Sequence, residues 1–203
     1  MIIYPKEYCI FDFETTGLTP EDCKIIEIGA LRVKNGKQEQ FSWLIKWPGL
    51  SVPAKITEIT GITDSMIDLF NYTPALAWYE FFEFSRGLPM IGHNIINFDI
   101  PFLEAMNAHV NDKNACFDVA ELKRNCVDTA ALYKAKKLSA DRMYNESLYA
   151  FCKRVMEIRA FGVKFNVGVC CDELGIDKSA AQQHRAEGDV FLTHEIYKKI
   201  CLK

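Results

Sequence analysis

The sequence predicts an α/β fold in which a mixed five-stranded sheet is flanked by helices. The 203 residues are 49% hydrophobic and include 14 Phe, 8 Tyr and 3 Trp, which is enough apolar surface for a substantial core. The first part of the chain reads as three successive strands, and strands then alternate with helices. Strands followed by such alternation indicate a mixed sheet covered by helices.

The strand candidates are short apolar segments. The first, YCIFDF, is almost continuously apolar, as expected of a buried central strand. The second and third are joined at Asn35-Gly36, a strong hairpin signal, so the first three strands are predicted to form an antiparallel meander. The five candidates lie at residues 8–13, 25–33, 40–47, 88–91 and 126–128.

The helix candidates begin at capping or proline residues. Pro53 is expected to begin a short helix that Gly61 ends, and Thr73-Pro74 to begin a longer helix that is rich in aromatic side chains. Most of the chain after the fifth strand is expected to be helical. The remaining helical segments are predicted at residues 97–108, 138–166 and about 184–200.

Length and composition favour one soluble domain over residues 1–203, with residues 138–166 as a longer helical insertion. Lys6 and Glu7 interrupt the apolar N-terminal segment, and no run approaches the roughly 20 apolar residues of a membrane span. The 8 cysteines include no C-x-x-C pair, which is typical of reduced thiols in a cytosol. We therefore expect a cytoplasmic protein without a membrane segment.

Charge is distributed unevenly along a chain whose net charge is -3. Residues 1–122 hold 9 basic and 17 acidic side chains, whereas residues 123–164 hold 10 basic and 4 acidic ones. The basic segment is compatible with solvated helix faces. It is also compatible with a surface that meets the phosphates of a nucleic acid.

The first cluster of candidate functional residues is FDFETTGL, residues 11–18. Asp12 and Glu14 are two apart on a strand, so both carboxylates point to the same face. Flanking apolar residues indicate that the strand is buried, where paired carboxylates are costly unless a cation lies between them. Oxygen ligands without a thiolate or imidazole beside them favour magnesium or manganese over zinc.

The second cluster, GHNIINFDIPFL, lies where a strand ends and a helix begins. Asp99 falls in the first turn of that helix, where an acid can bind a metal or simply complement the helix dipole. Asn94 and Asn97 are also typical of turns and caps. His93 is either a site residue or a hydrogen-bonded loop histidine.

The third cluster, HRAEGDVF, opens the last predicted helix. His184 lies at the helix start, where its ring can project from a loop toward a site or serve as a polar surface cap. Asp189 and Glu187 compete as the functional acid on spacing alone.

Together the clusters supply four carboxylates and a histidine from three separate strand or helix ends. Two divalent ions about 4 Å apart can activate a water and stabilise the leaving oxygen of a phosphodiester. Histidine is a natural base for the proton of that water near neutral pH. The combination therefore predicts metal-dependent phosphodiester hydrolysis.

These motifs resemble those of the DEDDh 3′-5′ exonucleases, which include the proofreading subunit of DNA polymerase III, ribonuclease T and oligoribonuclease. FDFETTGL, HNIINFDIPFL and HRAEGD resemble the first, second and third motifs, and KITEITGIT and CVDTAAL resemble segments between them. The third motif selects Asp189 over Glu187 and assigns His184 as the general base. Arg185 stands where the related branch would carry a catalytic tyrosine, which disfavours that branch.

The resemblance implies a ribonuclease H-like fold and the release of nucleoside monophosphates from single-stranded 3′ ends of DNA or RNA. It implies two Mg²⁺ or Mn²⁺ ions bound by Asp12, Glu14 and Asp189, with Asp99 binding directly or through water. A polymerase partner is compatible with it. The residues expected to contact the substrate are Thr15, Thr16, Gly17, Leu18, His93, Asn94 and Phe98.

Two further classes of function fit the motifs less well than an active exonuclease. A non-catalytic nucleic-acid-binding or polymerase-associated module on the same fold would not need all four carboxylates and the base. A nucleotide-binding oxidoreductase is disfavoured because no G-x-G-x-x-G follows a strand. The motifs do not distinguish DNA from RNA, since recognition of the 2′-hydroxyl depends on a few contacts that spacing does not supply.

Overall fold

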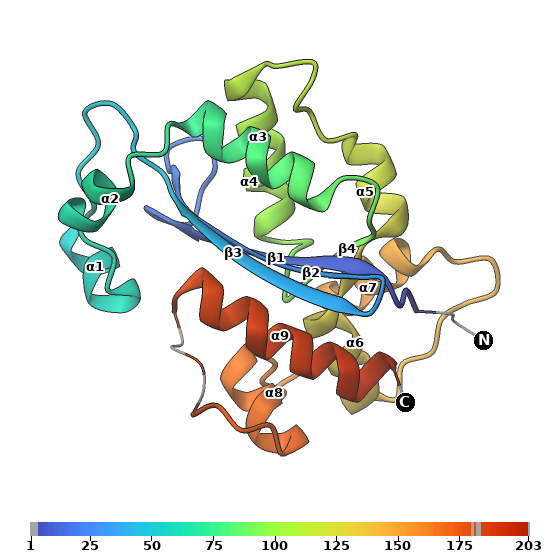
Figure 1. The fold of residues 1–203 in the computed structure, drawn as a ribbon. Helices are drawn as coiled ribbons and strands as arrows, with labels where there is room; N and C mark the ends of the chain where they lie inside the picture. Colours follow the sequence, from blue (N-terminus) through green and yellow to red (C-terminus); the bar gives the residue numbers. More distant parts are fainter. Residues whose placement is uncertain (1–3, 180, 182–183, 203) are drawn as a thin grey trace.

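The computed structural model describes residues 4–179, 181 and 184–202. Its sheet has the strand order β3-β2-β1-β4-β5 (Figure 1). The first three strands are antiparallel neighbours, whereas β4 and β5 run parallel to β1. This mixed sheet confirms the predicted architecture. The strands are β1 (Tyr8–Thr15), β2 (Ile25–Lys34), β3 (Lys37–Leu44), β4 (Met90–Gly92) and β5 (Val127–Asp128).

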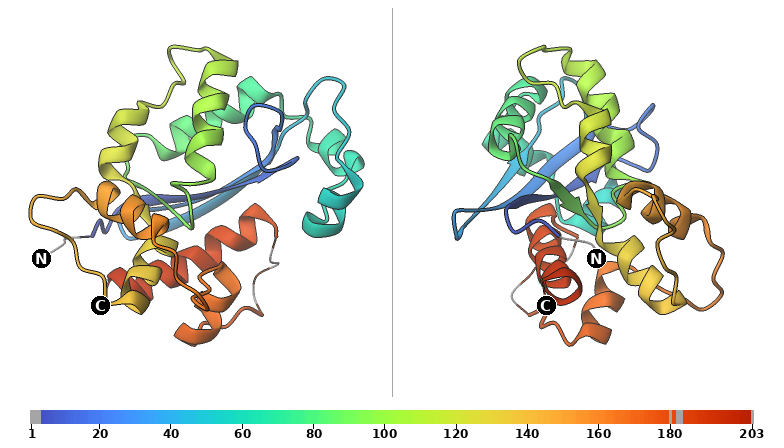
Figure 2. Two further views of the ribbon diagram at one scale, coloured as in Figure 1. Left: turned by 180° about the vertical axis from the view of Figure 1, so that it is seen from behind. Right: turned by 90° about the vertical axis from the view of Figure 1, so that its right-hand side faces the viewer.

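Helices cover both faces of the sheet. Figures 1 and 2 show α3, α4 and α5 on one side and α6, α8 and α9 on the other, with α1 and α2 at one end. None of the described helices is both long and apolar enough to cross a membrane. The helices are α1 (Ala54–Thr60), α2 (Asp64–Phe70), α3 (Pro74–Ser85), α4 (Asp99–Val110), α5 (Val119–Asn125), α6 (Thr129–Leu138), α7 (Leu148–Glu157), α8 (Val167–Leu174) and α9 (Ala186–Cys201).

Several boundaries differ from the sequence prediction for local reasons. The hairpin turn at Asn35-Gly36 is tighter than expected, so β3 begins at Lys37 and ends at Leu44. The last helix begins at Ala186, because His184 has a φ of 60°, which lies outside the right-handed helical region. The stretch 138–166, predicted to be helical, contains α7 between two loops.

Two short helices, α2 and α5, were not predicted from the sequence, and each begins at a side-chain cap. The Thr63 side chain accepts a hydrogen bond from Met66 N at the start of α2. The Asp118 side chain does the same for Glu121 N at the start of α5. Such caps satisfy backbone N–H groups that have no partner within the helix.

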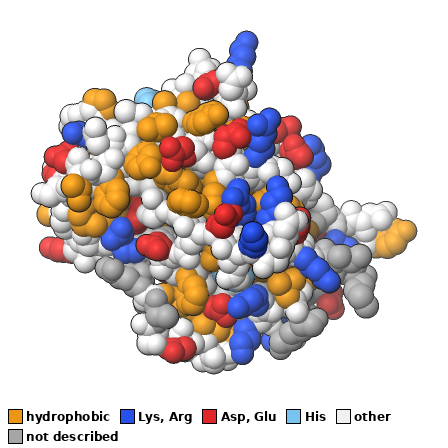
Figure 3. Space-filling model, in the orientation of Figure 1, with side chains coloured by type: hydrophobic (Ala, Val, Ile, Leu, Met, Phe, Trp, Pro, Cys, Tyr) orange, Lys and Arg blue, Asp and Glu red, His pale blue; other side chains and the backbone are white. Residues whose placement is uncertain are grey.

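The central strand β1 is buried on both faces. Phe11 and Phe13 form an aromatic cluster with Phe81 of α3, with ring centroids 5.8 Å from Phe81 in both cases. Alternation along the strand places Asp12 and Glu14 on the opposite face, which α9 covers. The outer face formed by α3 and β3 mixes charged side chains with exposed hydrophobic ones (Figure 3).

The beginning of α9 lies directly on β2. Gly29 faces Ala186 so closely that a Cβ on Gly29 would lie 2.4 Å from the Ala186 carbonyl carbon and oxygen. Gly29 pairs with Asp12 across the β1–β2 ladder. The missing side chain at position 29 therefore lets the start of α9 approach the sheet beside the Asp12 carboxylate.

Candidate active site

Three carboxylates from two elements meet at the end of β1. Asp12 and Glu14 come from β1, and Asp189 comes from the first turn of α9. One oxygen from each side chain lies within 4.8 Å of the others. Glu187, the competing acid on spacing, is exposed, and the group is completed by Asp189 instead.

Burial and mutual repulsion raise the pKa values of these three carboxyl groups. Burial raises the pKa of Asp12 well above its usual range, and the charges of Asp99, Asp189 and Glu14 raise it further. Burial, followed by repulsion from Asp189, raises the pKa of Glu14 to about 8. Burial also raises the pKa of Asp189 to about 6, although His184 opposes the shift. A divalent cation would favour the ionised forms, so this donor set fits a hard metal ion.

Asp99 is the first residue of α4 and is 2% exposed. Its Oδ1 accepts a hydrogen bond from Phe13 N at 3.0 Å, which ties α4 to β1 between Asp12 and Glu14. Burial raises the pKa of Asp99 to about 8, with the Phe13 hydrogen bond acting in the opposite direction. Asp99 thus lies beside the three-carboxylate group, with one oxygen already bonded to the backbone.

His184 is exposed and lies just before the N-cap of α9. Its backbone N donates a hydrogen bond to Asp189 Oδ2 at 3.2 Å, so the histidine and the carboxylate are directly connected. Both also line an open cavity of about 680 Å³ next to β4. The other lining residues are His93, Asn94, Lys164, Phe165, Asn166, Val167 and Gly168.

An ion pair that the motifs did not reveal holds the start of α9. Glu27 of β2 is fully buried, and its carboxylate accepts hydrogen bonds from Arg185 Nη2 at 2.7 Å and Nε at 3.1 Å. Ala186 N and Ser42 Oγ donate to the same carboxylate at 3.0 Å and 2.6 Å. Because Arg185 directly follows His184, this network fixes the chain on which the histidine sits.

We predict that Glu27→Ala lowers the free energy of unfolding by about 3–5 kcal/mol, because it leaves Arg185 without its partner in a largely buried place. Denaturant titration measures this change. Glu39→Ala is the control, since Glu39 is a half-exposed partner of Arg32 on the same sheet and should cost less than about 1 kcal/mol. Equal losses in the two variants would contradict the structural importance of the Glu27 network.

The expected substrate residues on the loop after β1 divide into two groups. The Thr15 hydroxyl donates to Gly17 O, and the Thr16 hydroxyl accepts from Lys24 N at 2.9 Å, so both hydroxyls close the loop on itself. A Cβ on Gly17 would lie 2.5 Å from the Cys23 sulfur, so a side chain at position 17 would require Cys23 to move. By contrast, the Leu18 side chain is 82% exposed and projects from the loop.

His93 is a hydrogen-bonded histidine of the turn after β4, and it also lines the cavity. It is 9% exposed, and burial lowers its pKa, which favours the neutral ring. The ring donates from Nε2–H to Phe165 O at 2.6 Å, and Nδ1 lies within hydrogen-bond distance, 2.9 Å, of the Thr129 hydroxyl, which also bonds Gly92 O at 3.0 Å. His93 therefore anchors one wall of the cavity, and both ring nitrogens have protein partners.

Asn94 and Phe98 lie on the turn between β4 and α4. Asn94 lines the cavity, and its backbone N donates to Asp128 Oδ1 at 3.0 Å. Asp128 is fully buried and also accepts from Ile96 N and Ala131 N, so it holds this turn in place. Phe98 is half-buried and packs against Phe102. The sequence motifs gave no role to Asp128.

Four of the ten basic side chains of segment 123–164 have partners within the protein. Arg154 bonds Glu146 at 2.7 Å and also donates to Asp141 O. Lys134 is buried and donates to Met156 O. Two further lysines pair with glutamates, namely Lys123 with Glu104 and Lys137 with Glu173. These four cations are neutralised or bonded within the protein, and the other six basic side chains of the segment form no ion pair with a described residue.

Sequence comparisons relate the chain to exonucleases. The family model described as Exonuclease (RNase_T) matches residues 9–197. The DNA polymerase III PolC-type protein of Clostridium perfringens is 30% identical over 198 residues, which are 96% of this chain and 11% of that protein. The PolC-type protein of Caldanaerobacter subterraneus is 34% identical over 137 residues, which are 66% of this chain and 10% of that protein. The chain thus matches only a small part of these relatives.

Solved structures of exonuclease I share the fold. A product-bound structure of exonuclease I has a TM-score of 0.72 at 16% identity, over 98% of this chain and 44% of that chain. E. coli exonuclease I in complex with a dA16 oligonucleotide has a TM-score of 0.71 at 16% identity, over 98% and 41%. These neighbours confirm the predicted ribonuclease H-like fold. With the family match over almost its whole length, the chain belongs to the exonuclease family, as the likeness of its three motifs to DEDDh enzymes predicts.

Proposed function

We propose that this chain is a 3′-5′ exonuclease that hydrolyses the terminal phosphodiester bond of a nucleic acid and releases nucleoside monophosphates. The observation that carries the proposal is the meeting of Asp12, Glu14 and Asp189 within 4.8 Å. Their juxtaposition with His184 beside an open cavity supports hydrolysis rather than binding alone. A non-catalytic binding module would have no use for carboxylates held at such an electrostatic cost.

The proposed metal site consists of Asp12, Glu14 and Asp189, with Asp99 as a fourth carboxylate beside them. Two Mg²⁺ or Mn²⁺ ions held there would supply water activation and stabilisation of the leaving oxygen. Asp99 keeps α4 against β1 through Phe13 N, and the Glu27–Arg185 pair keeps Asp189 and His184 on the sheet. These contacts hold the carboxylates in place before any substrate arrives.

His184 is proposed as the general base. His184 is exposed and lines the cavity, and the hydrogen bond from its backbone N to Asp189 Oδ2 fixes the residue relative to the carboxylates. From there it takes the proton of the attacking water. Leu18, exposed on the loop after β1, is proposed to pack beside the terminal base, and Asn94 to contact the terminal nucleotide.

Single-stranded DNA 3′ ends are the proposed substrate. Two facts about related proteins support DNA over RNA: the sequence relatives are DNA polymerase III PolC-type proteins, and a structural neighbour is complexed with dA16. The same relatives support a replicative polymerase as the partner, with removal of 3′-terminal nucleotides as the task.

Digestion of matched DNA and RNA oligonucleotides labelled at the 5′ end tests the proposal. With Mg²⁺ or Mn²⁺, we expect a ladder that shortens from the 3′ end, faster for DNA, and no reaction with EDTA. Glu187→Gln is a control that should remain active, because Glu187 is exposed and lies outside the carboxylate group. Absence of any ladder from the metal-loaded protein would favour the binding module instead.

A further inference from the structure

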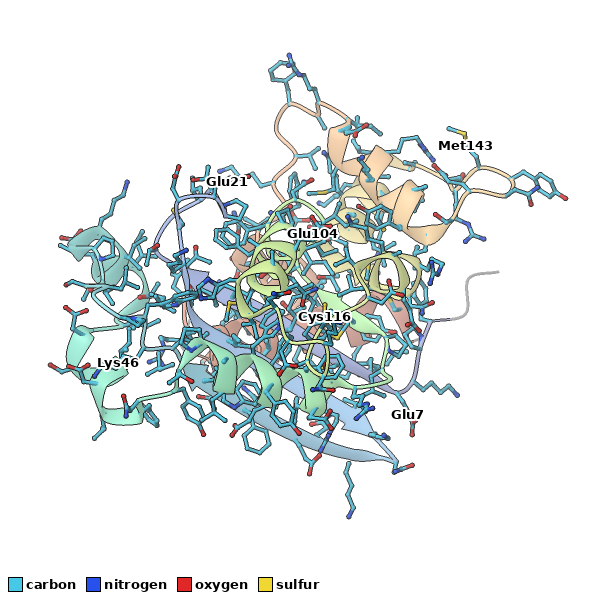
Figure 4. All side chains as sticks on the ribbon, turned by 90° about the horizontal axis from the view of Figure 1, so that it is seen from above. Glu7, Glu21, Lys46, Glu104, Cys116 and Met143 are labelled. Atoms are coloured by element: carbon cyan, nitrogen blue, oxygen red, sulfur yellow. The ribbon has the colours of Figure 1, made fainter. Side chains whose placement is uncertain are left out.

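The loop that joins α7 to α8 displays a phenylalanine to solvent. Phe161 is 102% exposed and contacts no core residue. It occupies a turn in which Val163 N donates to Ala160 O at 3.4 Å, and the next residue, Gly162, has a φ of 78°. Positive φ at this position is typical of a type II turn, which places Phe161 at the tip. Figure 4 shows the segment after α7 projecting away from the body of the molecule.

The loop itself carries charges of one sign. Residues 158–168 (IRAFGVKFNVG) contain no acidic residue. Arg159 and Lys164 are exposed, and neither forms an ion pair with a described residue. Arg154 on the neighbouring helix contrasts with them, since Glu146 neutralises it. The loop thus presents an aromatic ring between two available cations.

The same loop continues into the wall of the active-site cavity. Lys164 and the residues up to Gly168 line the cavity together with His184 and Asp189. His93 pins this wall through its hydrogen bond to Phe165 O at 2.6 Å. Three extended residues span at most about 11 Å, so Phe161 lies within that distance of the cavity-lining Lys164. Its ring is within reach of a strand that leaves the site.

We propose that residues 158–164, here called the α7–α8 loop, bind the single strand upstream of its 3′ terminus. Phe161 stacks on an unpaired base, while Arg159 and Lys164 contact the backbone phosphates. Cations alternating with exposed rings are how proteins hold single strands without reading their sequence. A protein partner would also cover a hydrophobic tip, but the free cations and the continuity with the cavity favour a polyanion. The inference rests on the proposed nuclease function and adds a binding site to it.

The first test varies substrate length. Phe161→Ala is expected to raise KM about 5- to 150-fold for an oligomer of about 12 nucleotides, the range of one lost base stack, with a much smaller effect on a dinucleotide. Tyr144→Ala is the matched control, because Tyr144 is 94% exposed on the other loop beside α7 and does not line the cavity. Phe161→Trp should restore most of the loss. Equal effects on long and short substrates, or no effect on either, would overturn the proposal.

The second test asks whether Phe161 contacts a base. Fluorescence anisotropy with the Asp12→Asn protein measures binding without cleavage, so its outcome is separate from any failure of the proposed catalysis. When residue 161 is Phe, an oligomer with abasic positions upstream of the 3′ end should bind more weakly than the intact oligomer. When residue 161 is Ala, the two oligomers should bind equally well. If the abasic oligomer loses the same affinity with Phe and with Ala at position 161, the ring does not stack on a base.

Discussion

Asp12→Asn is expected to abolish cleavage and at the same time to stabilise the metal-free protein. The rate should fall by roughly a thousandfold or more, since metal stabilisation of the reacting oxygens is worth several kcal/mol. The metal-free protein should gain stability because the amide cannot ionise, whereas burial and the neighbouring carboxylates disfavour the ionised form of Asp12. Added Mg²⁺ should then raise the melting temperature of the wild type clearly and that of the variant little.

The same carboxylates give the stability of the metal-free protein a defined pH dependence. A carboxyl group whose pKa is higher in the folded protein binds more protons there, so its contribution is present at low pH and is lost as the pH rises through the folded value. The folded pKa values of Glu14 and Asp99 are both raised to about 8. Melting temperatures measured with EDTA should therefore fall between about pH 4 and pH 8, and less steeply for Asp12→Asn. A wild-type profile that rises across this window would contradict the proposed electrostatics.

His184→Ala is expected to lower kcat by about two to four orders of magnitude, the usual effect of removing a positioned base. The wild-type rate should rise with pH as the base loses its proton and then level off, and the variant should lose this rise. Stabilisation by Mg²⁺ should survive, because the carboxylates that hold the ion are unchanged.

The control for this experiment is His109→Ala. His109 is an exposed residue of α4 that packs on Trp47, and it does not line the cavity beside His184. Both profiles should be recorded at saturating Mg²⁺, so that titration of the metal ligands does not contribute. A His184→Ala protein with the wild-type pH profile would show that another group takes the proton.

The sequence could predict what depends on local pattern. Alternation along one strand puts Asp12 and Glu14 on a common face, and apolar neighbours indicate that the face is buried. The choice of Asp189 over Glu187 came only from the resemblance, because spacing on a helix start does not distinguish them. The structure brings Asp189 to the other two carboxylates, while Glu187 faces solvent.

Features that depend on contacts between distant residues could not be predicted. Glu27 and Arg185 are separated by 158 positions, and no sequence pattern near either residue indicates that they form an ion pair. The motif left two interpretations of His93 open, and only the fold shows that its two ring nitrogens are hydrogen-bonded to Thr129 and Phe165. Such pairings follow from how helices pack on the sheet, and neither motif nor periodicity carries that information.

The position of Asp189 in α9 has a consequence for synthesis of the protein. During translation, residue 12 leaves the ribosome long before residue 189, and the strand carrying Asp12 and Glu14 waits for the last helix to dock on Gly29. Contacts across so long a separation in sequence form late and slowly. A nascent chain therefore holds only part of the proposed metal site, and nearby nucleic acids meet the complete group of carboxylates only after α9 has docked on the sheet.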